Sequence, residues 1–335
     1  MIPSHAIRKL AAPAPQENEL SEKEAFELAS AMLDGGVAEL ELGAILGAFA
    51  LRPLASVELV GFARAARGRV NRLPLPQGGD ASARRPVVVP SYGGAQQHPN
   101  LMPLVALALA RFGIPALVHG PLEGHGRVAT AAVLRELGIL PCASLREVQL
   151  RLGDPGVAYA PTALILPTLA QLLALRGRLG FENVAHQVAR LVDPFGGEGL
   201  MLVPADDSTQ LEPLRDAIAA LGDHALLFEG AEGEAYADPQ RRPAIEQLRA
   251  GERRVLFEAE PELAAAKAPR GASLPEAPDA RSTARWIGMA LDGKAALPAP
   301  IANLLACCLF AAGYTDDFNQ SKAIVAVRAH KLVAA

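Results

Sequence analysis

The pattern of apolar residues changes near residue 85, and this change limits the folds that the chain can adopt. Residues 1–70 carry apolar residues at helical spacing and contain no strand pattern. Ser21 and Glu24 stand three residues apart before the first clear apolar run, which is the sequence pattern of a capping box. Ser56 is the expected N-cap of a later helix. Helices are therefore predicted at 20–36, 38–53 and 55–70.

Beyond residue 85 the chain alternates between strand patterns and helix patterns. Strands are predicted at 86–90, 114–120, 199–204, 224–230 and 253–259. Helices are predicted at 100–113, 126–138, 167–194 with a break near Gly180, 211–222, 281–293 and 298–313. An order of strand, helix and strand implies a mostly parallel sheet with right-handed crossovers. The fold class predicted is a small helical N-terminal domain plus a larger α/β domain.

The domain boundaries follow from the same change of pattern. Residues 1–73 are assigned to the helical domain, which we expect to be completed by helices around 165–192. The stretch 71–86 is rich in Pro, Gly and Arg, and residues 74–84 within it are expected to form a linker. Residues 85–164 and 193–335 are assigned to the α/β domain.

Composition narrows the partners and the compartment. The formal net charge is −4, so any nucleic-acid binding requires a local basic patch. The three cysteines form no CxxC motif, which favours a reducing compartment and buried thiols. No segment approaches the ~18 uninterrupted apolar residues of a membrane span. The expected location is the cytoplasm, with no membrane association.

The segment 90–100, "PSYGGAQQHPN", lies between a predicted strand and a predicted helix. A glycine turn at such a junction is a common phosphate-binding arrangement, because backbone N–H groups point at the anion. This turn contains no Lys, Arg, Asp or Glu. Its two glycines, Gly93 and Gly94, therefore keep the backbone requirement of a phosphate loop without its charged side chains.

Several segments, in this order, resemble the anthranilate phosphoribosyltransferase family (glycosyltransferase family 3). They are "LDGGVAELELGAILGAFALRPLASVELVGFARAAR", "SYGG", "VHG", "ALRGRLGFENVAHQVARLVDP" and "EGAEGEA". The resemblance implies a helical domain joined to an α/β domain of nucleoside phosphorylase II-like architecture. It also implies homodimers and transfer of the phosphoribosyl group of PRPP to anthranilate, with magnesium.

The catalytic motifs of that family are only partly present. The family's GTGGD corresponds to 91–95, where Gly93 and Gly94 remain and Ala95 replaces the acid. Its NxST corresponds to 100–103, where Asn100 remains and both hydroxyl residues are absent. Its KHGN corresponds to 118–121, which lacks the lysine and the asparagine. The acidic pair that holds magnesium falls on Ala235 and Tyr236.

These departures remove the charges that the reaction needs. Departure of pyrophosphate requires neutralisation by magnesium and cations, and magnesium prefers carboxylate ligands and phosphates. The resemblance therefore implies no catalytic residue, no metal site, no cofactor and a degenerate phosphate/PRPP site. That site comprises Ser91, Gly93, Gly94, Asn100, His119, Gly120 and Arg127.

The divergent motifs are similar to those of the YbiB-type branch of the family. This resemblance implies homodimers that bind DNA or RNA with little sequence preference, through basic residues on the helix that corresponds to 169–180 and on its continuation. Arg176, Arg178 and Arg190 are the candidate nucleic-acid contacts. Arg176 also falls where the enzymes have an arginine that contacts anthranilate, so it fits both functions.

Two other functions remain open from the sequence. The first is a phosphoribosyltransferase that uses PRPP and Mg with an altered acceptor, in which Glu232, Glu234 and Asp238 supply the carboxylates. The second is an anion-binding regulatory protein that uses Gly93, Gly94 and Arg127.

Overall fold

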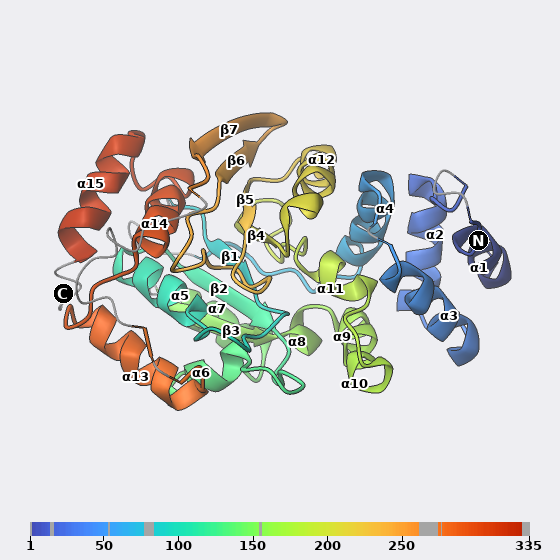
Figure 1. Cartoon of the computed structure of the whole chain (residues 1–335), viewed down its shortest axis with the longest axis horizontal. Coiled ribbons are helices and arrows are strands. Elements are labelled where there is room, and N and C mark those ends of the chain that lie inside the picture. The colour runs from blue at the N-terminus through green and yellow to red at the C-terminus, as the bar shows by residue number, and fades with distance from the viewer. Residues whose placement is uncertain are drawn as a thin grey trace.

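The computed structural model describes residues 2–13, 17–52, 54–76, 84–153, 156–260, 274–275 and 277–329. An N-terminal helical domain lies at one end of the molecule and a sheet with helices on both faces forms the rest (Figure 1). The sheet has seven strands in the order β3-β2-β1-β4-β5-β6-β7. The predicted class is confirmed: a small helical domain is joined to a larger α/β domain with a mostly parallel sheet.

Five of the seven strands are parallel, and the last two form an antiparallel hairpin at one edge. The strands are β1 (Val87–Pro90), β2 (Ala116–Gly120), β3 (Val157–Pro161), β4 (Leu200–Ala205), β5 (Ala225–Glu229), β6 (Ile245–Arg249) and β7 (Glu252–Phe257). The sequence did not predict β3 or β6. β6 reads "IEQLR", and its buried Glu246 and Gln247 hide the usual apolar run.

Side chains of the strands alternate between two cores. Val88 belongs to one core, whereas Val87 and Val89 belong to the other. One face is covered by α5 (Met102–Arg111), α6 (Thr130–Glu136), α13 (Ala280–Leu291), α14 (Ala299–Ala311) and α15 (Phe318–Ala329). The other face carries α7 (Leu145–Gly153), α8 (Thr162–Ile165) and α12 (Leu211–Leu221), with η2 (Ser208–Gln210) before α12.

The helical domain begins with α1 (Pro3–Leu10), α2 (Glu22–Leu33), α3 (Glu39–Ala50) and α4 (Ser56–Arg67). The predicted capping box is present, because Glu24 N donates to Ser21 Oγ at 3.3 Å and Ser21 N donates to Glu24 Oε2 at 2.9 Å. The prediction for Ser56 is wrong. Ala55 is the N-cap, and its N–H donates to Glu58 Oε2 at 2.9 Å.

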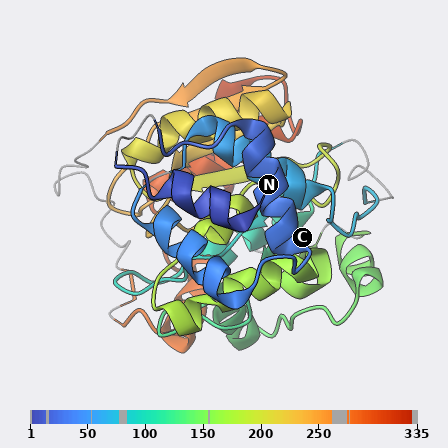
Figure 2. The same ribbon diagram turned by 90° about the vertical axis from the view of Figure 1, so that its right-hand side faces the viewer.

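A later segment of the chain packs on these helices. It forms α9 (Pro167–Ala174), α10 (Arg176–Leu179) and α11 (Val184–Ala189), and Gly180 ends α10 with φ of 79°. α9 contacts α2, and α11 contacts α3 and α4. Figure 2 shows the N-terminal helices in front of this segment. The helices of the N-terminal domain and those of 167–189 therefore share one core.

The close approach of α2 and α4 depends on a glycine. A Cβ at Gly61 would lie 2.4 Å from the carbonyl oxygen of Glu22. α4 also joins the helical domain to α12, where the Arg67 guanidinium donates to the buried Asp223 carboxylate. The connection to the sheet includes Asn71 and Leu73, whose N–H groups bond to Ile165 O and Pro194 O. Most of the expected linker, residues 77–83, lies outside the described residues.

Within the described part of the chain, no helix combines the length and the apolar character needed to cross a membrane.

Glu58 is the buried charge on which the helical domain depends, so its removal should be costly. Its carboxylate is fully buried, binds Arg52 through two nitrogens and accepts from Leu20 N and Ala55 N. Glu58→Ala leaves Arg52 without this partner, so we expect a loss of about 3–5 kcal/mol in the free energy of unfolding, measured by urea denaturation.

Glu22→Ala is the matched control in the same domain. Glu22 pairs with Arg64 at the surface, where both side chains are about half exposed. The expected change is below about 1 kcal/mol. Equal losses in the two variants would contradict the role assigned to Glu58.

Candidate functional site

Three loops meet at the carboxyl ends of the parallel strands. The glycine turn 91–100 follows β1, Gly120 ends β2, and the loop 230–237 follows β5. Their backbones are so close that side chains are excluded. A Cβ at Gly120 would lie 2.1 Å from Ser91 O, and one at Gly93 would lie 2.9 Å from Glu232 O. The glycines of the resemblance are therefore required by contact between loops.

A buried network of polar side chains fixes the glycine turn. Ser91 Oγ donates to Thr130 Oγ1 at 2.8 Å, and Asn100 Nδ2 donates to Thr130 Oγ1 at 2.9 Å and to Val128 O at 3.0 Å. Asn100 Oδ1 accepts from Met102 N at 3.2 Å. Ser91 and Asn100 are buried. Both residues hold the turn against the start of α6, which is a structural use of their hydrogen bonds.

His119 lies at the end of β2 and is fully buried. Its Nδ1 is 2.7 Å from the hydroxyl of Tyr92, which also accepts from Thr162 Oγ1 at 3.4 Å. Burial lowers the pKa of His119 to about 3, so its imidazole is neutral near pH 7. A neutral His119 does not neutralise a phosphate.

Glu232 accepts from the backbone of the glycine turn. Its carboxylate accepts from the N–H groups of Gln96 (2.8 Å), Gln97 (2.9 Å) and His98 (2.9 Å). Arg127 Nη2 also donates to it at 2.8 Å. Burial by itself raises the pKa of Glu232, but the donors from His98, Gln96 and Arg127 outweigh it and the pKa lies below its ordinary value.

Glu234 reaches the same turn from inside the protein. Its Oε1 accepts from Gly94 N, and its Oε2 has no hydrogen-bond partner within the described residues. The side chain is fully buried, and burial raises its pKa above the ordinary value, against the opposing effect of the Gly94 N–H. Together Glu232 and Glu234 occupy backbone N–H groups that a phosphate would need.

The arginines of the site are also paired within the chain. Arg127 lies between Glu232 (2.8 Å) and Glu182 (4.0 Å), and Arg176 pairs with Glu182 at 3.1 Å. Arg190 Nη2 is 2.6 Å from Asp206. Burial raises the pKa of Glu182. Three arginines are thus matched by three carboxylates, so the cleft contains its own counter-ions.

The three candidate nucleic-acid contacts do not share one surface environment. The side chain of Arg178 is 71% exposed and lies 3.6 Å from Glu39, whereas that of Arg190 is 3% exposed. Arg176 is mostly covered and lines a cavity. Arg190 is a buried partner of Asp206 in this fold, so Arg178 is the member of the trio that is open to solvent.

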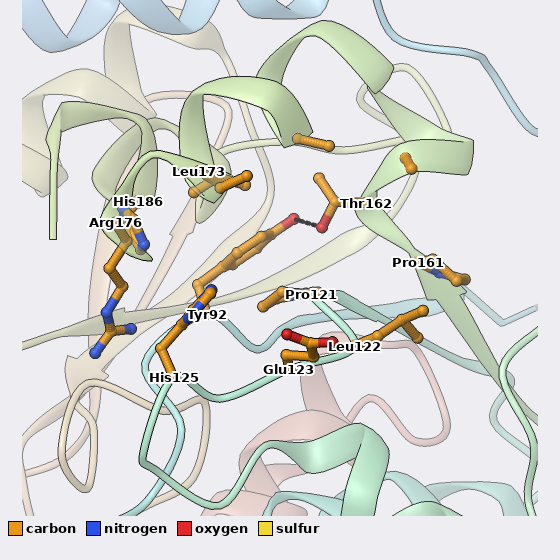
Figure 3. A pocket seen from close by; sticks show the side chains of 14 residues that line it. Tyr92, Pro121, Leu122, Glu123, His125, Pro161, Thr162, Leu173, Arg176 and His186 are labelled. Carbon is orange, nitrogen blue, oxygen red and sulfur yellow. Dashed lines mark hydrogen bonds between the residues drawn. The ribbon is translucent and has the colours of Figure 1, made fainter. Parts of the chain in front are cut away.

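A cavity of about 280 Å³ lies between the strand ends and the helices 162–189. Figure 3 shows Tyr92 across its centre, with Arg176, His186 and His125 on one side and Leu122 and Glu123 on the other. The remaining lining is mainly apolar and comes from β2, β3, α8 and α9. Burial lowers the pKa of His186 to about 4, so this imidazole is neutral near pH 7.

The carboxylates available for magnesium do not form a ligand set. No cluster of three or more His, Cys, Asp or Glu side chains suited to a metal occurs among the described residues. Glu232 and Glu234 accept from backbone N–H groups, and Asp238 Oδ1 accepts from Gln240 N at 2.8 Å. Magnesium requires several oxygen ligands around one point, and the described carboxylates are not gathered in that way, so the residues present do not fit this ion.

Comparisons with known proteins agree with the fold. Residues 4–69 match the family model described as "Glycosyl transferase family, helical bundle domain". The uncharacterized protein YbiB of Escherichia coli (strain K12) is 35% identical over 295 residues, which cover 88% of this chain and 89% of YbiB. The anthranilate phosphoribosyltransferase of Novosphingobium aromaticivorans is 26% identical over 324 residues, covering 92% of this chain and 91% of the enzyme.

Two solved structures show the same fold. The anthranilate phosphoribosyltransferase of Thermus thermophilus superposes with a TM-score of 0.73 at 22% identity, covering 98% of this chain and 95% of that chain. The Saccharomyces cerevisiae enzyme in complex with PRPP and Mg superposes with a TM-score of 0.71 at 15% identity, covering 98% and 93%. The architecture is that of a phosphoribosyltransferase of the anthranilate type. The chain belongs to the anthranilate phosphoribosyltransferase family, glycosyltransferase family 3.

The sequence did not predict the residues that bind the glycine turn and the arginines of the site. Glu234 was considered as a metal ligand, but its oxygen accepts from Gly94, 140 residues away in the chain. Glu182 and Asp206 were not singled out as partners of Arg176 and Arg190. A spacing signal did exist in "EGAEGE", where two glutamates flank a glycine with φ of 75° in a turn after a strand.

Glu234 and Glu232 should respond oppositely to removal of their charge. Because the folded state raises the pKa of Glu234, it binds that proton more tightly than the unfolded chain, and stability falls as pH rises above the ordinary value. Glu234→Gln keeps an acceptor for Gly94 without a buried charge. We expect it to raise stability at pH 7.5 by about 1 kcal/mol or more, and by less at pH 5, in thermal unfolding.

Glu232→Gln is the matched comparison. The folded state lowers the pKa of Glu232, so its stabilisation is present above the ordinary carboxyl pKa and is lost as pH falls through the folded value. This variant should be less stable than the wild type at pH 7.5, with a smaller difference near pH 4. The same sign for both variants at pH 7.5 would overturn these assignments.

Proposed function

We propose that this chain is a family member without phosphoribosyl transfer that binds nucleic acid with little sequence preference, as a homodimer. The observation that carries the first part is the occupation of the glycine turn by Glu232 and Glu234. PRPP would have to displace these carboxylates and then approach their negative charge. A like charge next to a phosphate is unfavourable, and more so where water is excluded.

Phosphoribosyl transfer with Mg and an altered acceptor is the weaker alternative. It requires Glu232, Glu234 and Asp238 to leave their present hydrogen bonds and form a metal site together. It also requires Arg127 to release Glu232. The cavity beside Arg176 could hold an aromatic acceptor, but it contributes nothing to the neutralisation of pyrophosphate.

Nucleic-acid binding is supported by the resemblance to the YbiB-type branch and by the exposure of Arg178 at the end of α10. Arg176 and Arg190 act indirectly in this proposal, because their pairs with Glu182 and Asp206 hold the segment 176–190 in place. A single exposed arginine supplies modest affinity, and two copies in a dimer double the number of phosphate contacts.

A homodimer through the helical domain is supported by its exposed apolar side chains. Leu40 and Leu51, near the two ends of α3, are 84% and 89% exposed, and Ile2 beside α1 is 71% exposed. α1 and α3 are in contact, so these side chains belong to one region of the domain. We propose that these three side chains contribute to one apolar patch, the kind of surface that marks an association site.

The catalytic part predicts no release of pyrophosphate from PRPP. The full chain, with millimolar Mg and anthranilate, should show no more pyrophosphate than a blank in an enzyme-coupled assay, because loss of several electrostatic contacts removes orders of magnitude in rate. Glu234→Gln and Glu232→Gln should remain inactive. Magnesium-dependent release of pyrophosphate by the wild type would refute this part.

The nucleic-acid part predicts strong dependence on salt and on one arginine. In gel-shift titrations with single- and double-stranded DNA, affinity should fall with salt along a log–log slope of roughly −0.7 to −0.9 per phosphate neutralised. Arg178→Glu should weaken binding of every sequence and reduce the slope by about one for each copy of the site.

Arg135→Glu provides the matched control, since Arg135 is exposed on α6 and the substitution changes the net charge equally. It should leave binding nearly unchanged. Equal losses for both variants would assign the effect to net charge, and an affinity that does not change with salt would refute electrostatic binding altogether.

A further inference from the structure

A second cavity, with a polar lining, lies at the opposite ends of the strands from the family site, which is the glycine turn with Arg127, Arg176 and Arg190. Arg85 precedes β1, and Arg249 ends β6 next to the start of β5, where Leu248 pairs with Ala225. This edge is therefore the amino-terminal edge of the parallel strands. The cavity has a volume of about 570 Å³ and lies between the hairpin β6–β7 and the end of α14. It shares no lining residue with the cavity of Figure 3.

Three arginines line this cavity, and the hairpin register explains why two of them meet. In the strand register Arg249 lies opposite Glu252, and Gln247 lies opposite Arg254. These four side chains therefore leave the hairpin on the same face. Arg85 lies in the same lining together with Thr315. Glu252 and Asp316 are the acidic members, which leaves a net charge of +1 over the five ionisable side chains of the lining.

The guanidinium groups are held in place but not neutralised to the same extent as those of the family site. Arg254 stacks over Phe310 at 4.9 Å. Arg85 Nη1 donates to Glu198 O at 3.0 Å, and its distance to the Glu198 carboxylate is 3.6 Å. Within the described residues, neither Arg249 nor Arg254 forms an ion pair.

The field of these arginines also reaches the protein interior. His224 lies at the start of β5 and bonds through Nε2 to Gln247, which lines the cavity. Burial first, and then the charges of Arg85 and Arg249, lower the pKa of His224 to about 4. Two guanidinium groups therefore act on one point beside the cavity.

We infer that this cavity binds a phosphate-bearing anion through Arg85, Arg249 and Arg254. Guanidinium groups donate two parallel N–H bonds to phosphate oxygens, and three of them around one cavity offer more donors than a single carboxylate can accept. The inference does not rest on the proposed nucleic-acid binding. The anion has two possible sources, a free phosphate compound or the backbone of a nucleic acid.

Titration calorimetry with sodium pyrophosphate tests the inference. The full chain is titrated at fixed ionic strength, adjusted with NaCl. We expect one site per chain, and an affinity at least about tenfold weaker in the double variant Arg249→Gln, Arg254→Gln. Arg249→Gln alone, at an exposed position, should weaken binding without changing the melting temperature. Arg178→Gln is the control and should bind pyrophosphate like the wild type.

A short single-stranded DNA in the cell distinguishes the two sources. Competition with pyrophosphate assigns the site to a nucleic-acid backbone, and lack of competition assigns it to a free phosphate compound; either result supports the anion site. No binding of pyrophosphate to the wild type at millimolar concentration, or unchanged binding to the double variant, overturns the inference. DNA binding that depends on Arg178 is measured separately, so each proposal can fail alone.

Discussion

The contact between the 230–237 loop and the glycine turn decides what the carboxyl edge of this sheet can do. Backbone N–H groups at such a turn require an acceptor, and here Glu232 and Glu234 supply it from the same chain. This contact joins the loops that follow β1 and β5, and through Arg127 it also joins the loop that follows β2. The family architecture is thus retained, and in this chain protein carboxylates accept the N–H groups of the glycine turn.

Burial explains why the arginines beside the glycine turn differ from those of the second cavity. Arg190 is enclosed by the fold, and a buried charge persists only with a partner, which is Asp206. Arg127 and Arg176 are mostly covered and share Glu182. At the amino edge of the sheet, Arg249 and Arg254 belong to a peripheral hairpin, so water can solvate them without an internal counter-ion. Whether an arginine in this fold can bind a ligand therefore depends on how deeply its side chain is buried. That burial cannot be predicted from the neighbouring residues in the sequence.

The sequence predicted the fold class because that information is local and periodic. The capping box at Ser21 and Glu24 and the apolar strand of β1 depend on nearest neighbours in the chain. β6 escaped prediction because buried Glu246 binds Arg215 and Arg253, so a polar residue occupies a core position. The hydrogen bonds of the glycine turn could not be predicted for a related reason. Glu234 and Gly94 meet only after the sheet is assembled, and no local pattern records that pairing.

The N-terminal helices α2–α4 pack against α9 and α11 from a distant part of the chain, with three strands of the sheet between the two segments. During synthesis on a ribosome, the first 70 residues emerge long before the segment that completes their core. The apolar faces of α2 and α4 must therefore wait for about 100 further residues before they are covered, at a rate of about 5–20 residues per second. The part of those faces that α9 and α11 later cover therefore stays exposed for about 5–20 seconds, an interval in which apolar surface favours aggregation.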